Sequence, residues 1–327
     1  MLRQPRWARD SALLLSIAAL GLAAPLACGG DDDDAQAAPP GPGEDASTPP
    51  DDGAPSETTT DAPATIFTER PYAVTTPSKY DAKVATPLVV LLHGYSGNAS
   101  FQDSYFRLSA LAQTKTFLVA LPEGTKDALK NQFWNASDAC CDFAQTGVDD
   151  VAYLKALIAD MKSRFNVDAK RVYVVGHSNG GFMAHRMACE LSAEIAGIVS
   201  LAGAAYADPA KCAASQPVAV LQVHGDADET VSYAGGTLVA GAGAYPSAKA
   251  TVATWAEKNG CDAALTATGD TLDLDTGLAG AETTIERHAC TAGAAELWTI
   301  AGGAHIPSFG AAWAERLYGF LEAHPKP

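Results

Sequence analysis

Unbroken runs of apolar residues alternate with helical patterns along most of the chain. Each run is four to eleven residues long and most of them end at a glycine or a short polar loop. Continuous hydrophobicity over such lengths is typical of strands that are buried on both faces, as in parallel sheets. The runs lie at 87–92, 117–121, 172–175, 195–205, 218–223 and 296–301.

Helical periodicity separates these runs. Apolar residues from Val148 to Met161 fall on one face at a period of 3.6, a second helical pattern starts at Phe182, and a third spans about 308–323. Strands that alternate with helices predict an α/β fold, a doubly wound and mostly parallel sheet with helices on both faces. Ligands of such sheets bind at the carboxyl ends of the strands. The loops that follow the strands are therefore where chemistry is expected.

Two further local patterns complete the prediction of elements. Short alternating patches between Thr65 and Ala85 favour an edge hairpin. Asp149 and Asp150 fall in the first turn of the helix at 148–161, where carboxylates stabilise the helix dipole. This capping role is favoured over a catalytic one for both residues.

The N-terminal 65 residues differ from the rest. Residues 1–28 combine Arg3, Arg6 and Arg9 with an apolar stretch too short to span a bilayer, which is typical of an export signal. Cys28 follows small residues at the end of this stretch and resembles a lipobox cysteine, although Pro25 departs from that pattern and leaves ordinary cleavage open. Residues 29–65 contain seven prolines, eight Asp, two Glu and no Lys or Arg, and we interpret them as a disordered acidic tether.

Charge limits the choice of partners. The net charge is −16, and most of it comes from the tether. Residues 66–327, predicted to form a single catalytic domain, remain moderately acidic and show no basic stripe. Nucleic acid is therefore not an expected partner, whereas a membrane is one if Cys28 carries lipid.

Six cysteines follow Cys28, in a chain predicted to be exported to where disulfides persist. No C-x-x-C or paired His spacing favours zinc, so disulfides are predicted and no metal site. Cys261 and Cys290 bracket one segment and are the favoured pair. A bridge between the neighbours Cys140 and Cys141 is disfavoured because a vicinal disulfide is strained, and the partners of Cys189 and Cys212 stay open.

The strand at 171–175 breaks at Gly176 and continues into a helix. Gly176-His177-Ser178-Asn179-Gly180 matches G-x-S-x-G, the nucleophile elbow that exposes a serine on a tight strand-to-helix turn. The pentapeptide alone is a weak signal, but the strand before it and the helix after it are the context that such an elbow needs. Ser178 is the predicted nucleophile.

Two later strand exits supply partners for Ser178. The loop after 218–223 carries Asp226, Asp228 and Glu229, all placed to satisfy the order Ser, acid, His. Asp228 is favoured because its spacing lets the loop turn back to the sheet, while Asp226 is expected to bond its own turn. His305 is the histidine that lies between the last strand and the last helix, and it is the predicted base.

The remaining parts of the site are less specific. His93 and His224 lie at strand ends and His177 is expected to point away from the Ser178 hydroxyl, so all three are assigned structural roles. The loop after 87–92 offers backbone N–H groups, Tyr95 foremost, that would form an oxyanion hole with the N–H of Asn179. Each such donor stabilises a transition state by about 3 kcal/mol.

Taken in order, the motifs resemble the secreted esterases grouped as polyhydroxybutyrate depolymerase-like and feruloyl esterase-like. They are His93-Gly94-Tyr95 with Asn98, Trp134-Asn135-Ala136 with Cys140-Cys141, Val148-Asp149-Asp150-Val151, the Gly176–Gly181 elbow, His224-Gly225-x-x-Asp228 and Gly302-Gly303-x-His305. The resemblance covers about residues 85–325. It implies an α/β-hydrolase fold, hydrolysis of carboxylic esters without a metal or organic cofactor, and a role for Trp134 in substrate binding.

The sequence thus predicts an exported serine esterase that acts on aromatic or hydroxyacyl esters, free or linked to a polysaccharide or polyester. Ile306 follows His305 where the family often has tryptophan, so the substrate pocket is expected to differ. A serine peptidase on the same fold is one alternative. A surface-tethered binding protein without catalysis is another, although Ser178, Asp228 and His305 are all present.

Overall fold

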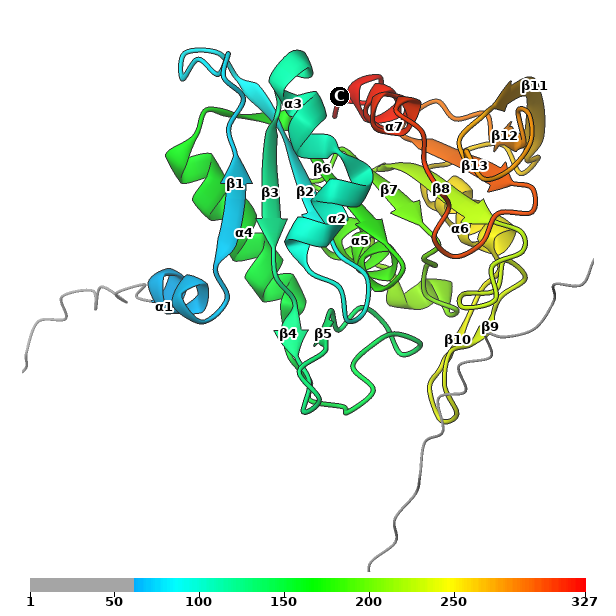
Figure 1. Ribbon diagram of the computed structural model, residues 1–327, viewed down its shortest axis with the longest axis horizontal. Coiled ribbons are helices and arrows are strands. Elements are labelled where there is room, and N and C mark those ends of the chain that lie inside the picture. Colours follow the sequence, from blue (N-terminus) through cyan, green and yellow to red (C-terminus); the bar gives the residue numbers. More distant parts are fainter. Residues whose placement is uncertain (1–61) are drawn as a thin grey trace, which may run out of the picture. The chain divides into compact units, whose positions relative to one another are not determined.

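The computed structural model describes residues 62–327, with side chains from Ile66 onward (Figure 1). The predicted export signal, Cys28 and the tether up to residue 61 lie outside the described residues. Helix α1 (Ala62–Glu69) begins before residue 66, where the folded domain was expected to start. Pro63 stands in its first turn, where a missing backbone N–H costs nothing. The described part of the chain therefore begins with a helix that includes residues 62–65.

Nine strands form one twisted sheet in the order β1-β3-β2-β6-β7-β8-β13-β12-β11 (Figure 1). The six from β3 to β13 are parallel, and β1, β12 and β11 pair antiparallel at the two edges. The strands span Tyr72–Thr75 (β1), Thr86–Leu92 (β2), Leu118–Pro122 (β3), Val167–His177 (β6), Gly197–Leu201 (β7), Ala219–Gly225 (β8), Thr266–Leu272 (β11), Thr283–Arg287 (β12) and Ala294–Ile300 (β13). The predicted run of buried parallel strands is confirmed.

Helices cover both faces of the sheet. One layer holds α2 (Ala99–Phe106), α3 (Leu108–Lys115) and α7 (Ala312–Glu322), and the other holds α4 (Asp150–Arg164), α5 (Asn179–Glu190) and α6 (Ala248–Lys258) (Figure 1). The residues of β2 alternate between the two layers: Val89 and Leu91 pack with Phe106 and Trp313, while Leu88 and Val90 belong to the core that contains Tyr153. This three-layer arrangement confirms the predicted α/β-hydrolase fold.

The two sheet edges differ from expectation. The hairpin predicted between Thr65 and Ala85 is wrong: Ile66 and Phe67 lie in α1, and β1 pairs with β3, not with a neighbour in sequence. At the opposite edge, the antiparallel pair β11 and β12 was not predicted because β11 is mostly polar and exposed. An exposed edge strand lacks the apolar run that marks a buried one.

Short elements extend the loops at the carboxyl ends of the strands. They are the ribbons β4 (Thr125–Lys126) with β5 (Gln132–Phe133) and β9 (Gly236–Thr237) with β10 (Ala244–Tyr245), and the 3₁₀ helix at Pro209–Lys211. Within residues 62–327, every helix is too short or too polar to cross a bilayer.

Three disulfides link the six cysteines of the described range. Cys261 is bonded to Cys290, as predicted, and Cys189 to Cys212. The prediction that Cys140 and Cys141 bond elsewhere is wrong, because these two neighbours are bonded to each other across a cis peptide. With the other four cysteines paired among themselves, the vicinal bond is the pairing that the fold leaves to Cys140 and Cys141.

Candidate active site

Ser178 stands at the turn between β6 and α5. Its backbone has φ 55° and ψ −121°, a conformation that L residues rarely adopt. A Cβ on Gly176 would lie 2.1 Å from the carbonyl oxygen of Gly180, and one on Gly180 would lie 2.4 Å from that of Leu92. The turn therefore requires glycine at both positions, as the G-x-S-x-G pattern predicts.

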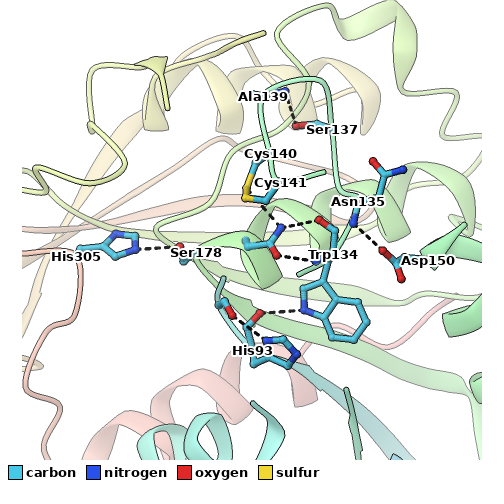
Figure 2. Close-up of a disulfide and its surroundings, with 12 residues drawn as sticks. His93, Trp134, Asn135, Ser137, Ala139, Cys140, Cys141, Asp150, Ser178 and His305 are labelled. Atoms are coloured by element: carbon cyan, nitrogen blue, oxygen red, sulfur yellow. Dashed lines mark hydrogen bonds between the residues drawn. A yellow bond between two sulfur atoms is a disulfide. The ribbon is translucent and has the colours of Figure 1, made fainter. Parts of the chain in front are cut away.

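The imidazole of His305 connects Ser178 to Asp228. His305 Nε2 is 2.9 Å from Ser178 Oγ, and His305 Nδ1 is 2.8 Å from Asp228 Oδ2 (Figure 2 shows the serine contact). A carboxylate accepts at Nδ1, so this nitrogen carries the proton and leaves Nε2 free to accept from the serine hydroxyl. This is the geometry in which a histidine acts as a general base toward serine.

Asp228 is held as a carboxylate. Its side chain is buried, and Oδ1 accepts from the backbone N–H groups of Thr230 and Val231, both at 2.8 Å. Burial acts to raise the pKa of Asp228, but hydrogen bonds from His224, His305 and the backbone outweigh it and hold the pKa well below its usual range. A carboxylate in this place can stabilise the imidazolium that forms when a histidine takes a proton from serine.

The other two acids of the same loop do not reach His305. Asp226 was expected to bond its own turn, but its Oδ1 accepts from the backbone N–H of Gly302, 2.6 Å away, and so ties the β8 exit to the loop that carries His305. Glu229 is exposed. Among the three acids that the sequence left open, the structure brings only Asp228 to the histidine.

His177 supports the backbone of His305. Its side chain lines the cleft together with Ser178, and Nε2 donates to the carbonyl oxygen of His305 at 2.9 Å. Burial and the neighbouring His305 lower the pKa of His177 to about 4, so the ring is neutral at pH 7. Tyr105 packs edge-on against His177 and donates its hydroxyl to the carbonyl oxygen of Pro307 at 2.8 Å. Sequence reasoning missed this support because the two segments are 128 residues apart.

A cleft of about 400 Å³ opens at Ser178. It is lined by Gly94–Asn98, Phe101, Gln102, His177, Ser178, His305 and Ile306. No residue within 62–327 accepts a hydrogen bond from the backbone N–H of Tyr95 or of Asn179. Both N–H groups are thus available to a ligand oxygen beside Ser178.

Trp134 does not line this cleft, which corrects its assignment to substrate binding. The indole is fully buried, stacks near Tyr153, and donates from Nε1 to the carbonyl oxygen of His93 at 2.9 Å (Figure 2). Its backbone forms two hydrogen bonds with the side chain of Asn179, at 2.7 and 2.8 Å. Burial of a large apolar ring contributes strongly to stability, and the buried indole of Trp134 supports the turn that carries Ser178.

The vicinal disulfide Cys140–Cys141 contacts the same two residues, Asn179 and Trp134. Asn179 Nδ2 donates to Cys140 Sγ at 3.4 Å, and the backbone N–H of Cys141 donates to the carbonyl oxygen of Trp134 (Figure 2). The loop from Trp134 to Cys141 therefore contacts the residue that directly follows Ser178. No sequence signal other than the two adjacent cysteines could have located this contact.

The acidic pair Asp149 and Asp150 lies at the start of helix α4, and its two members have different roles. Asp149 caps α4 by accepting from the backbone N–H of Ala152, as the sequence indicates. Asp150 instead is fully buried, pairs with Arg70 at 2.7 Å and accepts from the backbone N–H of Asn135. Burial raises the pKa of Asp150 while Arg70 acts to lower it. Its role is to hold the loop at Asn135.

Within residues 62–327 no three His, Cys, Asp or Glu side chains gather in a way that could hold a metal ion. His93 is committed to the fold: Nε2 accepts from the backbone N–H of Gly124 and Nδ1 donates to the carbonyl oxygen of Gly94.

Known proteins resemble the chain in sequence and fold. A feruloyl esterase B of Piromyces equi is 30% identical over 191 residues, and a poly(3-hydroxyalkanoate) depolymerase C of Paucimonas lemoignei is 30% identical over 174 residues. These matches cover 57% and 52% of this chain but only 34% and 39% of the relatives. An acetyl xylan esterase from Aspergillus awamori has a TM-score of 0.57 at 16% identity over 77% of this chain and 95% of its own, which supports the fold.

These relatives confirm the resemblance that the motifs indicated. The model of the phospholipase/carboxylesterase family matches residues 78–243, about half of the chain, and includes the elbow at Ser178. The chain belongs to the phospholipase/carboxylesterase family of α/β-hydrolases.

Proposed function

We propose that the protein is an exported serine carboxylesterase of the feruloyl esterase and polyhydroxybutyrate depolymerase type. The observation that carries this proposal is the hydrogen-bonded row of Ser178, His305 and Asp228 at the head of an open cleft. The named relatives, a feruloyl esterase and a polyhydroxyalkanoate depolymerase, support an ester as substrate.

The mechanism follows from the hydrogen bonds. Ser178 Oγ attacks the ester carbonyl carbon while His305 Nε2 takes the hydroxyl proton, and Asp228 stabilises the imidazolium that forms. The backbone N–H groups of Tyr95 and Asn179 receive the developing oxyanion. His305 then gives its proton to the leaving alkoxide, and an acyl-enzyme remains on Ser178. Water repeats the sequence, releasing the acid and restoring the serine.

The cleft suits an apolar acyl group. Phe101 and Ile306 lie on its rim and are both 56% exposed, so each offers apolar surface to a ligand. An aromatic ring or a short hydroxyacyl chain fits beside them, whereas a polar acyl group would leave this surface uncovered. The substrate class is therefore an aromatic or hydroxyacyl ester.

We further propose that the chain is organised for export. Residues 1–28 act as the signal, Cys28 as a lipid attachment site that holds the protein at a membrane, and residues 29–65 as the tether to the catalytic domain. Disulfides at Cys189–Cys212 and Cys261–Cys290 suit an oxidising compartment outside the cytoplasm.

Release of ferulic acid from methyl ferulate by the full chain tests the function, with Ser178→Ala as the matched control. We expect release that is abolished in the variant. Hydrolysis of a small aliphatic ester without release from methyl ferulate would move the substrate to hydroxyalkanoate or acetyl esters. Inactivity of a folded protein on both esters would contradict the proposal.

A further inference from the structure

A second and larger cavity lies next to the Ser178 cleft. Its volume is about 790 Å³, and none of the three residues of the proposed triad lines it. The two spaces meet at an aromatic pair, because Tyr95 lines the cleft, Phe143 lines the cavity and their ring centroids are 5.7 Å apart. A ligand that occupies both spaces would have to pass this aromatic pair.

The cavity has one apolar and one polar wall. The apolar wall is the tip of the β9–β10 ribbon, residues 239–243, which carries only Val, Ala and Gly. The polar wall comes from the loop at 135–147, from Arg186 on α5 and from Tyr206 and Lys211. Such a space suits a chain that is apolar along its length and polar at one end.

Most charges on the polar wall are already paired. Lys211 forms an ion pair with Asp138. Asp142 accepts from the backbone N–H groups of Thr146 and Gly147, at 2.9 and 2.7 Å, and so closes its own turn. Asp138 is thus compensated by Lys211, whereas Asp142 keeps its negative charge while its oxygens are occupied by the turn.

Arg186 is the cation that remains. Its Nη1 donates to the carbonyl oxygen of Asn135 at 2.5 Å and its Nε is shielded from solvent, so Nη2 is the nitrogen without a partner that a ligand could reach. No carboxylate within residues 62–327 forms an ion pair with Arg186, although its charge acts to lower the pKa of the buried Asp150. A guanidinium with unused donors binds carboxylates by paired, charge-assisted hydrogen bonds. Nearby, the pKa of Tyr206 is raised by burial, and its hydroxyl stays a neutral donor without a partner among the described residues.

The position of Arg186 sets the length of the ligand. Arg186 follows Ser178 by eight residues on the same helix, which corresponds to about 12 Å along its axis. An ester bound with its carbonyl at Ser178 and a carboxylate at Arg186 must therefore bridge roughly this distance.

We infer that the cavity binds the free carboxylate end of a linear hydroxyacyl oligoester, with Arg186 as the residue that recognises the carboxylate. This inference rests on the proposed function and specifies its substrate: the fragment that leaves as an alcohol carries the carboxylate into the cavity, while the acyl fragment stays at Ser178. The Val, Ala and Gly wall offers apolar surface to the methyl-bearing chain of an oligoester, while the polar wall receives its charged end.

Equilibrium binding tests the inference without depending on catalysis. The probes are the linear trimer of 3-hydroxybutyrate as its free acid and as its primary amide, which is similar in shape and uncharged. Their affinities for the full chain carrying Ser178→Ala are measured by calorimetry at pH 7. We expect the acid to bind about 10- to 100-fold more tightly than the amide, as a hydrogen-bonded charge pair predicts.

Substitutions at Arg186 locate the effect. Arg186→Gln in the same background should reduce the ratio of acid to amide affinity to about one, and Arg186→Lys, which keeps the charge, should retain part of it. Arg164→Gln is the matched control, since Arg164 lies on α4 and pairs with Asp160 outside the cavity. The ratio also separates recognition from any loss of packing, because loosening of the Asn135 loop would weaken both probes alike.

Equal affinities of acid and amide for the Ser178→Ala chain would overturn the inference, as would a preference that survives Arg186→Gln. Neither result touches the proposed function, which is decided by hydrolysis of methyl ferulate and a small aliphatic ester by the unsubstituted chain. Conversely, inactivity on those esters with an intact acid preference would contradict the esterase and leave a carboxylate-binding site at Arg186.

Discussion

The cluster at Ser178 and the cavity at Arg186 lie side by side but are built in opposite ways. In the cluster, His305 is fixed at both ring nitrogens, its backbone is held by His177, and Asp228 accepts four contacts from ring and backbone donors. In the cavity, Arg186 keeps a buried donor unused and the opposite wall is a short ribbon of small residues.

This difference separates chemistry from selection. The residues proposed to move protons lie at the ends of buried strands, where hydrogen bonds leave them one arrangement. The residue proposed to meet the far end of a substrate, Arg186, lies on α5 and keeps open hydrogen-bonding capacity. Substitutions in the cluster should therefore change kcat for every ester, and substitutions in the cavity should change the preference among esters.

The largest effect is expected from Asp228→Asn. The amide cannot hold His305 in the tautomer that accepts from Ser178, so kcat should fall by about 10⁴-fold on any ester. Glu229→Gln is the matched control, because Glu229 is exposed in the same loop and should leave kcat unchanged. A fall in kcat of similar size in Glu229→Gln, or no fall in Asp228→Asn, would contradict the catalytic role of the cluster at Ser178.

The disulfides should differ in how much each contributes to the free energy of unfolding. Joint replacement of Cys189 and Cys212 by alanine should lower the free energy of unfolding by about 3 kcal/mol, since the bond closes a loop in the unfolded chain. The same replacement of Cys140 and Cys141 should cost clearly less, because a bond between sequence neighbours closes no such loop. Urea unfolding compares the two, and equal losses would contradict this division.

Acid should destabilise the protein through its buried neutral histidines. The pKa values of His177 and His185 are both lowered to about 4 by burial, below the value of an unfolded histidine. The unfolded chain therefore takes up protons first as pH falls below about 6.5, and each histidine removes about 2 kcal/mol of stability by pH 5. Unfolding free energies at pH 8 and pH 5 should show a smaller loss in His177→Phe than in the unsubstituted chain. An equal loss would mean that His177 is not neutral in the folded state.

The smallest effect is expected from His177→Phe on catalysis. The variant removes the hydrogen bond to the carbonyl oxygen of His305, so the ring should sit less accurately beside Ser178. We expect kcat to fall by about 10-fold with little change in KM, since misplacement of a catalytic group acts on the reaction step. A change confined to KM would mean that His177 acts through its place in the cleft lining and not by positioning His305.

Much of the fold could be predicted because buried parallel strands leave a direct trace in sequence. β2, β3, β8 and β13 are apolar on both faces, and the elbow needs glycines that no other residue can replace. β11 left no such trace, because an exposed edge strand is polar. The pair Ile66-Phe67 was wrongly predicted to lie in a hairpin, because two apolar residues do not distinguish a helix turn from a strand.

The site divides in the same way. The contact of His305 with Ser178 and Asp228 could be predicted because each residue follows a strand of a known kind in a fixed order, and their catalytic roles stay a proposal. Trp134 was misassigned, because a motif that places an aromatic residue near a site does not show whether the residue lines the site or lies beneath it. The vicinal disulfide was rejected because of its local strain, although the fold pairs the other four cysteines among themselves. The cavity at Arg186 could not be foreseen, because its walls come from segments that are distant in sequence and meet only in the folded chain.

The central claim is that Ser178 is the nucleophile and His305 its base. Reaction of the full chain with diethyl 4-nitrophenyl phosphate, followed by mass mapping of its peptides, tests it most directly. We predict one diethylphosphoryl group on Ser178, with loss of esterase activity in step with labelling and much slower labelling in His305→Gln. A label on another residue, or activity that persists after complete labelling of Ser178, would contradict the account.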